Sequence, residues 1–224
     1  MFRVAARELP ETLRIARPGT TVAFAKRDAV ATGYEAAVRA AREHGFEATL
    51  RLAGGRAAIF YDGTMEIGHA VPDDEPRARI HERFERTAER LARALAAVGV
   101  DARVGEVAGE YCPGRYSVNA RGVAKLAGIG QRVVGGGSHT GVVLVVEGEG
   151  RINAVLEPVY AALGLDWDPA ATGSVRAEAP SATWDLVADA IVTEYAREYD
   201  LVEDEVDPQT LALAKSLAPE HRVT

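Results

Sequence analysis

The chain has 224 residues, of which 47% are hydrophobic and 26% are charged, and its formal net charge at pH 7 is -7. These values are typical of a globular domain in water, and the excess of acidic residues argues against a general nucleic-acid binder. The one cysteine cannot form an intramolecular disulfide, no cysteine–histidine group has zinc spacing, and the N-terminus shows neither a signal-peptide pattern nor a membrane-length apolar run. We therefore expect a single cytoplasmic domain over residues 1–224, without a metal, nucleic-acid or membrane partner.

The first third of the chain alternates between strand and helix patterns. Residues 20–25 (TTVAFA) have the composition of a short buried strand. Residues 33–45 predict a helix with one apolar face, formed by Tyr34, Ala37, Val38 and Ala41. Alternate apolar residues over 46–52 and the apolar run in 56–63 predict two further strands. Because Gly54 and Gly55 lie between them, the sequence predicts a hairpin with a glycine turn.

The longest predicted helix covers residues 80–98, where apolar side chains recur every three or four positions before Gly99. Residues 122–133 predict a strand, and residues 133–150 predict two apolar runs around a flexible connection. Three amphipathic helices are then expected over 152–164, 184–199 and 208–221, the last capped by Asp207 before Pro208. This alternation predicts an α/β (α+β) fold, a mixed sheet flanked by helices, with the C-terminal helices 152–221 packed on the same sheet.

Cys112 is the first candidate for chemistry. A lone cysteine is more often a small buried hydrophobe, but Pro113 and Gly114 place this one in a turn, where a thiol is exposed and influenced by its neighbours. A nearby cation or helix N-terminus would favour its thiolate, which attacks thioester carbonyls. The turn therefore favours a nucleophile.

Lys125 is the second candidate, since the chain supplies nearly all its other positive charge as arginine. The alternative is a lysine on the exposed face of a strand, which is its usual place. Its neighbours are apolar, however, and glycines interrupt the strand on both sides, as happens when a ligand lies against the backbone. A lysine at this position is suited to binding an acyl carbonyl or a phosphate oxygen.

The Gly54–Gly55 pair is the third candidate. Arg51 and Arg56 flank these glycines, whose backbone could approach a ligand closely, although such pairs more often only make turns. The spacing fits neither a dinucleotide fingerprint nor a phosphate-binding P-loop.

Taken in order, these segments resemble the lipoate-protein ligase and octanoyltransferase family of the biotin/lipoate ligase superfamily. The resemblance covers residues 20–165 well and the C-terminal helices loosely. Its motifs are the Arg51-x-x-Gly54-Gly55-Arg56 loop, the long helix, the Lys125-Leu126-Ala127-Gly128-Ile129-Gly130-Gln131-Arg132 segment, and a turn at Ser138-His139-Thr140-Gly141 before an apolar strand.

The resemblance implies a biotin/lipoyl ligase-like catalytic domain, with an acyl or lipoyl chain in a tunnel under the Gly-Gly loop. Lys125 takes the place of the family lysine that binds the acyl carbonyl or the acyl-adenylate phosphate. The substrate-binding set it implies comprises Arg51, Gly54, Gly55, Arg56, Gly128, Gln131 and His139. His139 either positions the thioester, or acts as base for the incoming lysine, or is a turn residue at the sheet edge.

Cys112 resembles the nucleophile of the cysteine-dependent octanoyltransferases, so the first hypothesis is protein-lysine acylation through a Cys112 thioester. Acyl carrier protein is then the expected donor and a lipoyl domain or glycine-cleavage H-type protein the acceptor, with no cofactor. The alternatives are an ATP- and Mg-dependent lipoate-protein ligase acting through an acyl-adenylate, and a non-catalytic acyl- or lipoyl-binding module.

Two details of the resemblance bear on substrate and partner. Arg56 occupies the third glycine position of the ligase loop, where it would enter the pocket or pair with an acidic group or phosphate. Because the expected acceptors are acidic, we expect docking on a local basic patch of Arg115, Arg121 and Arg132.

Overall fold

The computed structural model describes residues 1–223. Within this range the larger sheet has six strands in the order β1-β5-β9-β8-β7-β6, with every neighbouring pair antiparallel. Its strands are β1 (Thr12–Ala16), β5 (Thr64–Pro72), β6 (Ala102–Val104), β7 (Val118–Ala120), β8 (Ala124–Val134) and β9 (Gly137–Val145). The long central strands β5, β9 and β8 give the sheet its length, and β8 confirms the strand predicted around Lys125.

A smaller sheet has the order β3-β2-β4, from β2 (Thr21–Phe24), β3 (Glu47–Leu50) and β4 (Ala58–Phe60). The three strands were all predicted, but the prediction of a hairpin between β3 and β4 is wrong. β2 lies between them, parallel to β3 and antiparallel to β4, so the Gly54–Gly55 segment crosses over β2. Turn residues indicate a change of direction, whereas the strand partner depends on the rest of the sheet.

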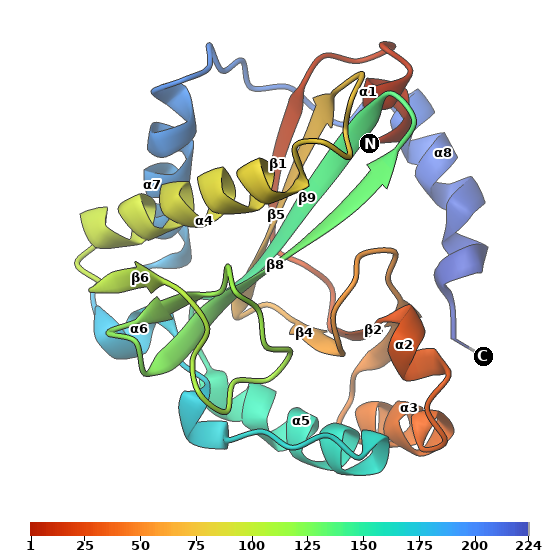
Figure 1. Ribbon diagram of the computed structural model, residues 1–224, viewed down its shortest axis with the longest axis vertical. Helices are drawn as coiled ribbons and strands as arrows, with labels where there is room; N and C mark the ends of the chain where they lie inside the picture. The colour runs from red at the N-terminus through yellow and green to blue at the C-terminus, as the bar shows by residue number, and fades with distance from the viewer. Residues whose placement is uncertain (224) are drawn as a thin grey trace.

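Helices cover both sheets (Figure 1). The predicted helix over 80–98 is confirmed as α4 (Ile80–Ala97), and that over 33–45 as α3 (Tyr34–Glu43). The three C-terminal helices are α5 (Glu149–Leu163), α7 (Trp184–Ala196) and α8 (Pro208–Leu217), and Asp207 caps α8 as expected by accepting the N–H groups of Gln209 and Thr210. Short helices complete the chain: α1 (Phe2–Ala5), α2 (Lys26–Ala29), α6 (Val175–Glu178), and the 3-10 turns η1 (Pro169–Ala171) and η2 (Ala218–His221).

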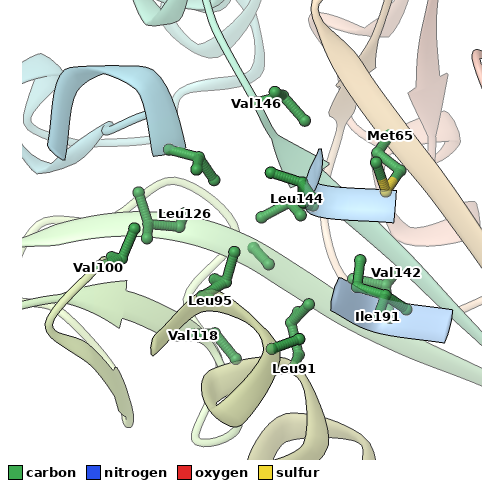
Figure 2. Packing of buried hydrophobic residues seen from close by; sticks show 14 of the residues in the cluster. Met65, Leu91, Leu95, Val100, Val118, Leu126, Val142, Leu144, Val146 and Ile191 are labelled. Carbon is green, nitrogen blue, oxygen red and sulfur yellow. The ribbon is translucent and has the colours of Figure 1, made fainter. Parts of the chain in front are cut away.

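Two hydrophobic cores hold the layers together. In the first, α4 and α7 pack on one face of the larger sheet, where Leu91 and Leu95 of α4 meet Leu126, Leu144 and other strand residues (Figure 2). The second joins the smaller sheet to α3 and α5. Burial of these side chains supplies the main drive for folding. The α/β class with helices flanking the sheets is confirmed.

The C-terminal helices occupy three different places. α5 packs on α3 beside the smaller sheet, and α7 packs on α4 over the larger one. α8 lies on the other side of the larger sheet from α4 and α7 (Figure 1). A single catalytic domain remains a prediction. Among the residues that the structure describes, none of the helices combines the length and the apolar character needed to span a bilayer.

Candidate active site

The face of the larger sheet that is turned away from α4 borders a cavity of about 980 Å³. Its floor is formed by β8 and β9, where Gly128, Gly130 and Gly141 carry no side chain, and Gly130 lies directly opposite Gly141. The Gly-Gly loop, the turn at Cys112, and helices α1 and α8 form the other walls. This volume is at the upper end of the roughly 300–1,000 Å³ range of ligand-binding clefts.

Cys112 lies in the wall of this cavity, in a half-buried turn. Its backbone has a φ of 44°, in the left-handed region that residues other than glycine rarely adopt. Such a conformation costs free energy and persists only where surrounding contacts impose it. Two sets of contacts impose it here, one from the Gly-Gly loop and one from Lys125.

The Gly-Gly loop holds the sulfur. The Arg56 backbone N–H donates a hydrogen bond to Cys112 Sγ at 3.1 Å, and Arg51 Nη2 lies 3.8 Å from the same atom. Arg51 Nη2 also donates to the Arg56 carbonyl at 2.6 Å, which closes the loop around the glycines. The sulfur therefore faces hydrogen-bond donors from the Gly-Gly loop, which fix its position.

Arg56 is not among the described residues that line the cavity. Its Nη1 donates to Asp28 Oδ1 at 3.1 Å, and the Asp28 side chain, which is 0% exposed, also accepts the Ala25 N–H at 2.9 Å. Of the two expectations for Arg56, pairing with an acidic partner is therefore the one the structure bears out, and that partner is internal. The ion pair anchors the loop whose backbone N–H reaches Cys112.

Lys125 is 1% exposed, so the alternative of a lysine on an open strand face is wrong. Its Nζ donates to the carbonyl oxygens of Cys112 at 2.8 Å and Tyr111 at 3.0 Å, and to Glu110 Oε1 at 3.1 Å. Nζ also lies 4.9 Å from the centre of the Tyr111 ring. The resemblance implied that Lys125 binds an acyl carbonyl or an adenylate phosphate, and this role stays a prediction. Lys125 lines the cavity, and its ammonium also holds the backbone of the cysteine turn.

The remaining predicted residues are divided between the cavity and its supports. Gly54 and Gly55 line the cavity, and a side chain at Gly55 would collide with Cys112 Sγ, because its Cβ would lie 2.8 Å away. Gln131 also lines the cavity, but its side chain donates to the Ile80 carbonyl at 2.8 Å and thereby ties β8 to the start of α4.

His139 lies within β9, so the prediction of a turn at this residue is wrong. The turn falls at Gly135–Gly136, where Gly136 has a φ of 81°, and the pairing of β8 with β9 continues without a break from there. His139 pairs with Arg132 on one side and Ala70 on the other, in the middle of the sheet and not at its edge. Its imidazole lines the cavity over Gly68 and Gly141.

Burial lowers the pKa of His139 below its ordinary value of 6.5, and burial also lowers the pKa of His69. Because the unfolded chain binds these protons more readily, the contribution of the two histidines to the free energy of unfolding is fully present above about pH 6.5 and falls as the pH drops below it. We expect urea unfolding to show this loss between about pH 6.5 and 5, and His139→Gln to reduce it. If the free energy of unfolding of wild type and of His139→Gln changed equally with pH, the lowered pKa of His139 would be contradicted.

Two of the three arginines suggested for docking, Arg115 and Arg132, line the cavity, whereas Arg121 pairs with Glu178 at 2.8 Å. Sequence reasoning missed Asp28 and Glu110, the buried carboxylates that anchor the Gly-Gly loop and the cysteine turn, because nothing local separates them from the exposed acids of the chain. It also gave no role to α8, whose inner side chains Leu213 and Leu217 line the cavity.

A model of the lipoyl protein ligase A/B catalytic domain family matches residues 2–195, which include both sheets, the cysteine turn and the cavity floor. The chain belongs to this family. The family resemblance drawn from the Arg51, Lys125 and His139 segments is thereby confirmed, although α8 lies beyond the matched residues.

Curated family members with similar sequences are named as transferases. The chain is 31% identical over 144 residues to an octanoyl-[GcvH]:protein N-octanoyltransferase of Geobacillus kaustophilus, covering 64% of the chain and 50% of that protein. It is 25% identical over 146 residues to a lipoyl-[GcvH]:protein N-lipoyltransferase of Listeria monocytogenes, covering 65% and 52%. The chain thus spans about half the length of these relatives.

Solved structures of lipoate-protein ligases share the fold. Lipoate-protein ligase A bound with ATP superposes with a TM-score of 0.76 at 18% identity, covering 97% of the chain and 87% of the ligase. The bi-partite lipoate protein ligase of Thermoplasma acidophilum gives a TM-score of 0.71 at 17% identity, with 96% and 84% covered. At these identities the likeness establishes the architecture alone.

Proposed function

We propose that this chain transfers an octanoyl or lipoyl group, through a thioester on Cys112, to the lysine of a lipoyl-domain protein. The observation that carries the proposal is the setting of the sulfur. The chain's one cysteine lies in the wall of a large cavity, in a strained turn, with the Arg56 N–H directed at Sγ. A buried structural cysteine has no need of such donors, whereas a nucleophilic thiolate does.

The reaction takes place in two acyl transfers. The Cys112 thiolate attacks the carbonyl carbon of the donor thioester, a bond to Sγ forms, and the donor leaves as a thiolate. The acceptor lysine amine then attacks the Cys112 thioester, an amide forms as the amine loses a proton, and the Cys112 thiolate is released. Each attack places negative charge on the acyl oxygen, and the Arg56 N–H and the Arg51 guanidinium are donors close to the sulfur that can stabilise it. His139 is our candidate to accept the lysine proton.

The partners follow from the chemistry. An acyl group that arrives already activated requires neither ATP nor another cofactor. GcvH appears as the acyl carrier in the names of the Geobacillus and Listeria relatives. We therefore propose GcvH-type proteins and acyl carrier protein as alternative donors and a lipoyl domain as the acceptor. Since a free thiolate requires reducing conditions, we place the reaction in the cytoplasm.

Intact-mass spectrometry tests the proposal. The purified protein is mixed with octanoyl-acyl carrier protein, with octanoyl-GcvH, or with octanoate plus MgATP, and wild type is compared with Cys112→Ala. We expect wild type to gain the mass of one octanoyl group from a carrier donor, and Cys112→Ala to gain none, because the variant has no thiol.

The other outcomes identify the alternatives. ATP-dependent modification of an added lipoyl domain that survives Cys112→Ala would reject the thioester and assign the chain to the ligases. Tight binding of octanoate without modification of protein or acceptor would leave a binding module.

A further inference from the structure

A carboxylate is buried two residues before the proposed nucleophile. The Glu110 side chain is 0% exposed and accepts four hydrogen bonds from the surrounding turn and strand. Oε2 accepts the Val107 N–H at 3.0 Å, and Oε1 accepts the Gly114 N–H at 2.8 Å, the Ser117 hydroxyl at 2.6 Å and Lys125 Nζ at 3.1 Å. A buried carboxylate is tolerated only with such partners, so its place in the sequence is specific.

These donors come from both sides of Cys112 in the sequence and from the strand β8. Val107 precedes Cys112, Gly114 and Ser117 follow it, and Lys125 reaches it from β8. One carboxylate therefore joins both arms of the turn to the strand that forms the cavity floor. Glu110 itself does not line the cavity among the described residues, so it would act through its neighbours.

The contacts of Lys125 indicate that this lysine is the neighbour through which Glu110 acts. An ammonium has three hydrogens, and here they meet Glu110 and the carbonyls of Tyr111 and Cys112. Those carbonyls belong to successive residues, and both can point at one ammonium only because the backbone turns at Cys112, where φ is 44°. The carboxylate fixes the ammonium, and the ammonium fixes the peptide that carries the thiol.

We propose that Glu110 is a positioning residue for acyl transfer, which acts by holding Lys125 against the backbone of Cys112. The inference rests on the proposed function and extends it, since it assigns the ion pair to the placement of Sγ and not to contact with the acyl group. It explains why a charge is buried here at all. A hydrogen-bonded loop could be closed by neutral groups, whereas a lysine in this position needs a charged partner.

The test uses Glu110→Gln, Lys125→Met, the double variant, and Glu89→Gln on the exposed face of α4 as a matched control. Glutamine has the size of glutamate, but donors face both of its terminal atoms, so its NH₂ group must meet one of them in either orientation. Glu89→Gln makes the same substitution at an exposed position and leaves the ion pair in place. Single-turnover acylation of Cys112 from octanoyl-GcvH or octanoyl-acyl carrier protein gives the maximal rate and the donor concentration at half that rate.

We expect Glu110→Gln to lower the maximal rate on the order of 100-fold, with the half-saturating donor concentration changed less than about threefold, because the thiol is displaced and the donor surface is not. Glu89→Gln should stay within about threefold of wild type in both. In thermal unfolding, the double variant should melt above either single variant, since it removes both buried charges together.

Three results would overturn the inference: near-normal acylation by Glu110→Gln, an equal loss in Glu89→Gln, or melting shifts that simply add in the double variant. Failure of the proposed function has a different signature, because wild type itself would then gain no acyl mass from either donor. The unfolding measurements do not depend on substrate and remain interpretable in that case.

Discussion

Lys125→Met is expected to lower the free energy of unfolding by about 3–5 kcal/mol, the usual cost of removing one partner of a buried ion pair. Glu110 would then be a buried charge without its cation, and the carbonyls of Tyr111 and Cys112 would lose their shared donor. Acylation of Cys112 should fall below detection, because the turn loses the contact that holds it in the left-handed conformation. Urea unfolding and intact-mass spectrometry measure the two effects.

Lys215→Met is the matched control for this change. The same substitution there removes an ammonium from the exposed face of α8 and should leave both the free energy of unfolding and the acyl mass gain near those of wild type. If Lys125→Met proved as stable and as reactive as Lys215→Met, the ion pair would have no part in holding the cysteine turn.

Gly55→Ala is expected to reduce acylation on the order of 100-fold and to lower the free energy of unfolding by about 1–3 kcal/mol. The added Cβ would lie 2.5 Å from Arg51 Nη2 and 2.8 Å from Cys112 Sγ, and Gly55 has a φ of 106° that alanine rarely adopts. The loop would have to move, and the Arg56 N–H would move with it away from the sulfur.

The adjacent glycine supplies the comparison. A Cβ at Gly54 would meet no atom within 4 Å among the described residues. Gly54→Ala is therefore expected to lower the acylation rate and the free energy of unfolding far less than Gly55→Ala. Urea unfolding and the time course of thioester formation, measured on both variants, separate the two positions. Similar losses at both would show that flexibility of the pair, and not the clearance over Cys112, is what the loop requires.

Periodic patterns predicted the elements of this fold better than their partners. α4 and α3 follow directly from apolar spacing, because a helix buries one face whichever layer it meets. The order β3-β2-β4 does not follow, since the residues near Gly54 and Gly55 are equally consistent with a hairpin and with a crossing over β2. The placement of His139 failed for a related reason, because three adjacent glycines leave the exact turn position open.

The site was predictable where one residue type is scarce. Cys112 and Lys125 could be selected from the sequence because cysteine and lysine are rare in this chain and both residues lie near glycines. In the structure, Lys125 Nζ lies 2.8 Å from the carbonyl oxygen of Cys112. Glu110 and Asp28 could not be found in this way, because the chain has 33 acidic residues and burial is a property of the assembled fold. Arg56 and Asp28 are 28 residues apart, and no local pattern links them.

The glycines in the cavity floor also affect how much conformational entropy is lost when a ligand binds. At Gly128, Gly130 and Gly141 the floor contributes backbone, which the ladder between β8 and β9 already holds in place. A floor of side chains would have rotamers to immobilise when a flexible acyl chain settles on it, at a cost of up to about 2 kcal/mol for each long side chain. For the proposed acyl substrate, we therefore expect the loss of conformational freedom at these three glycines to fall on the acyl chain, because their backbone has no rotamers to fix.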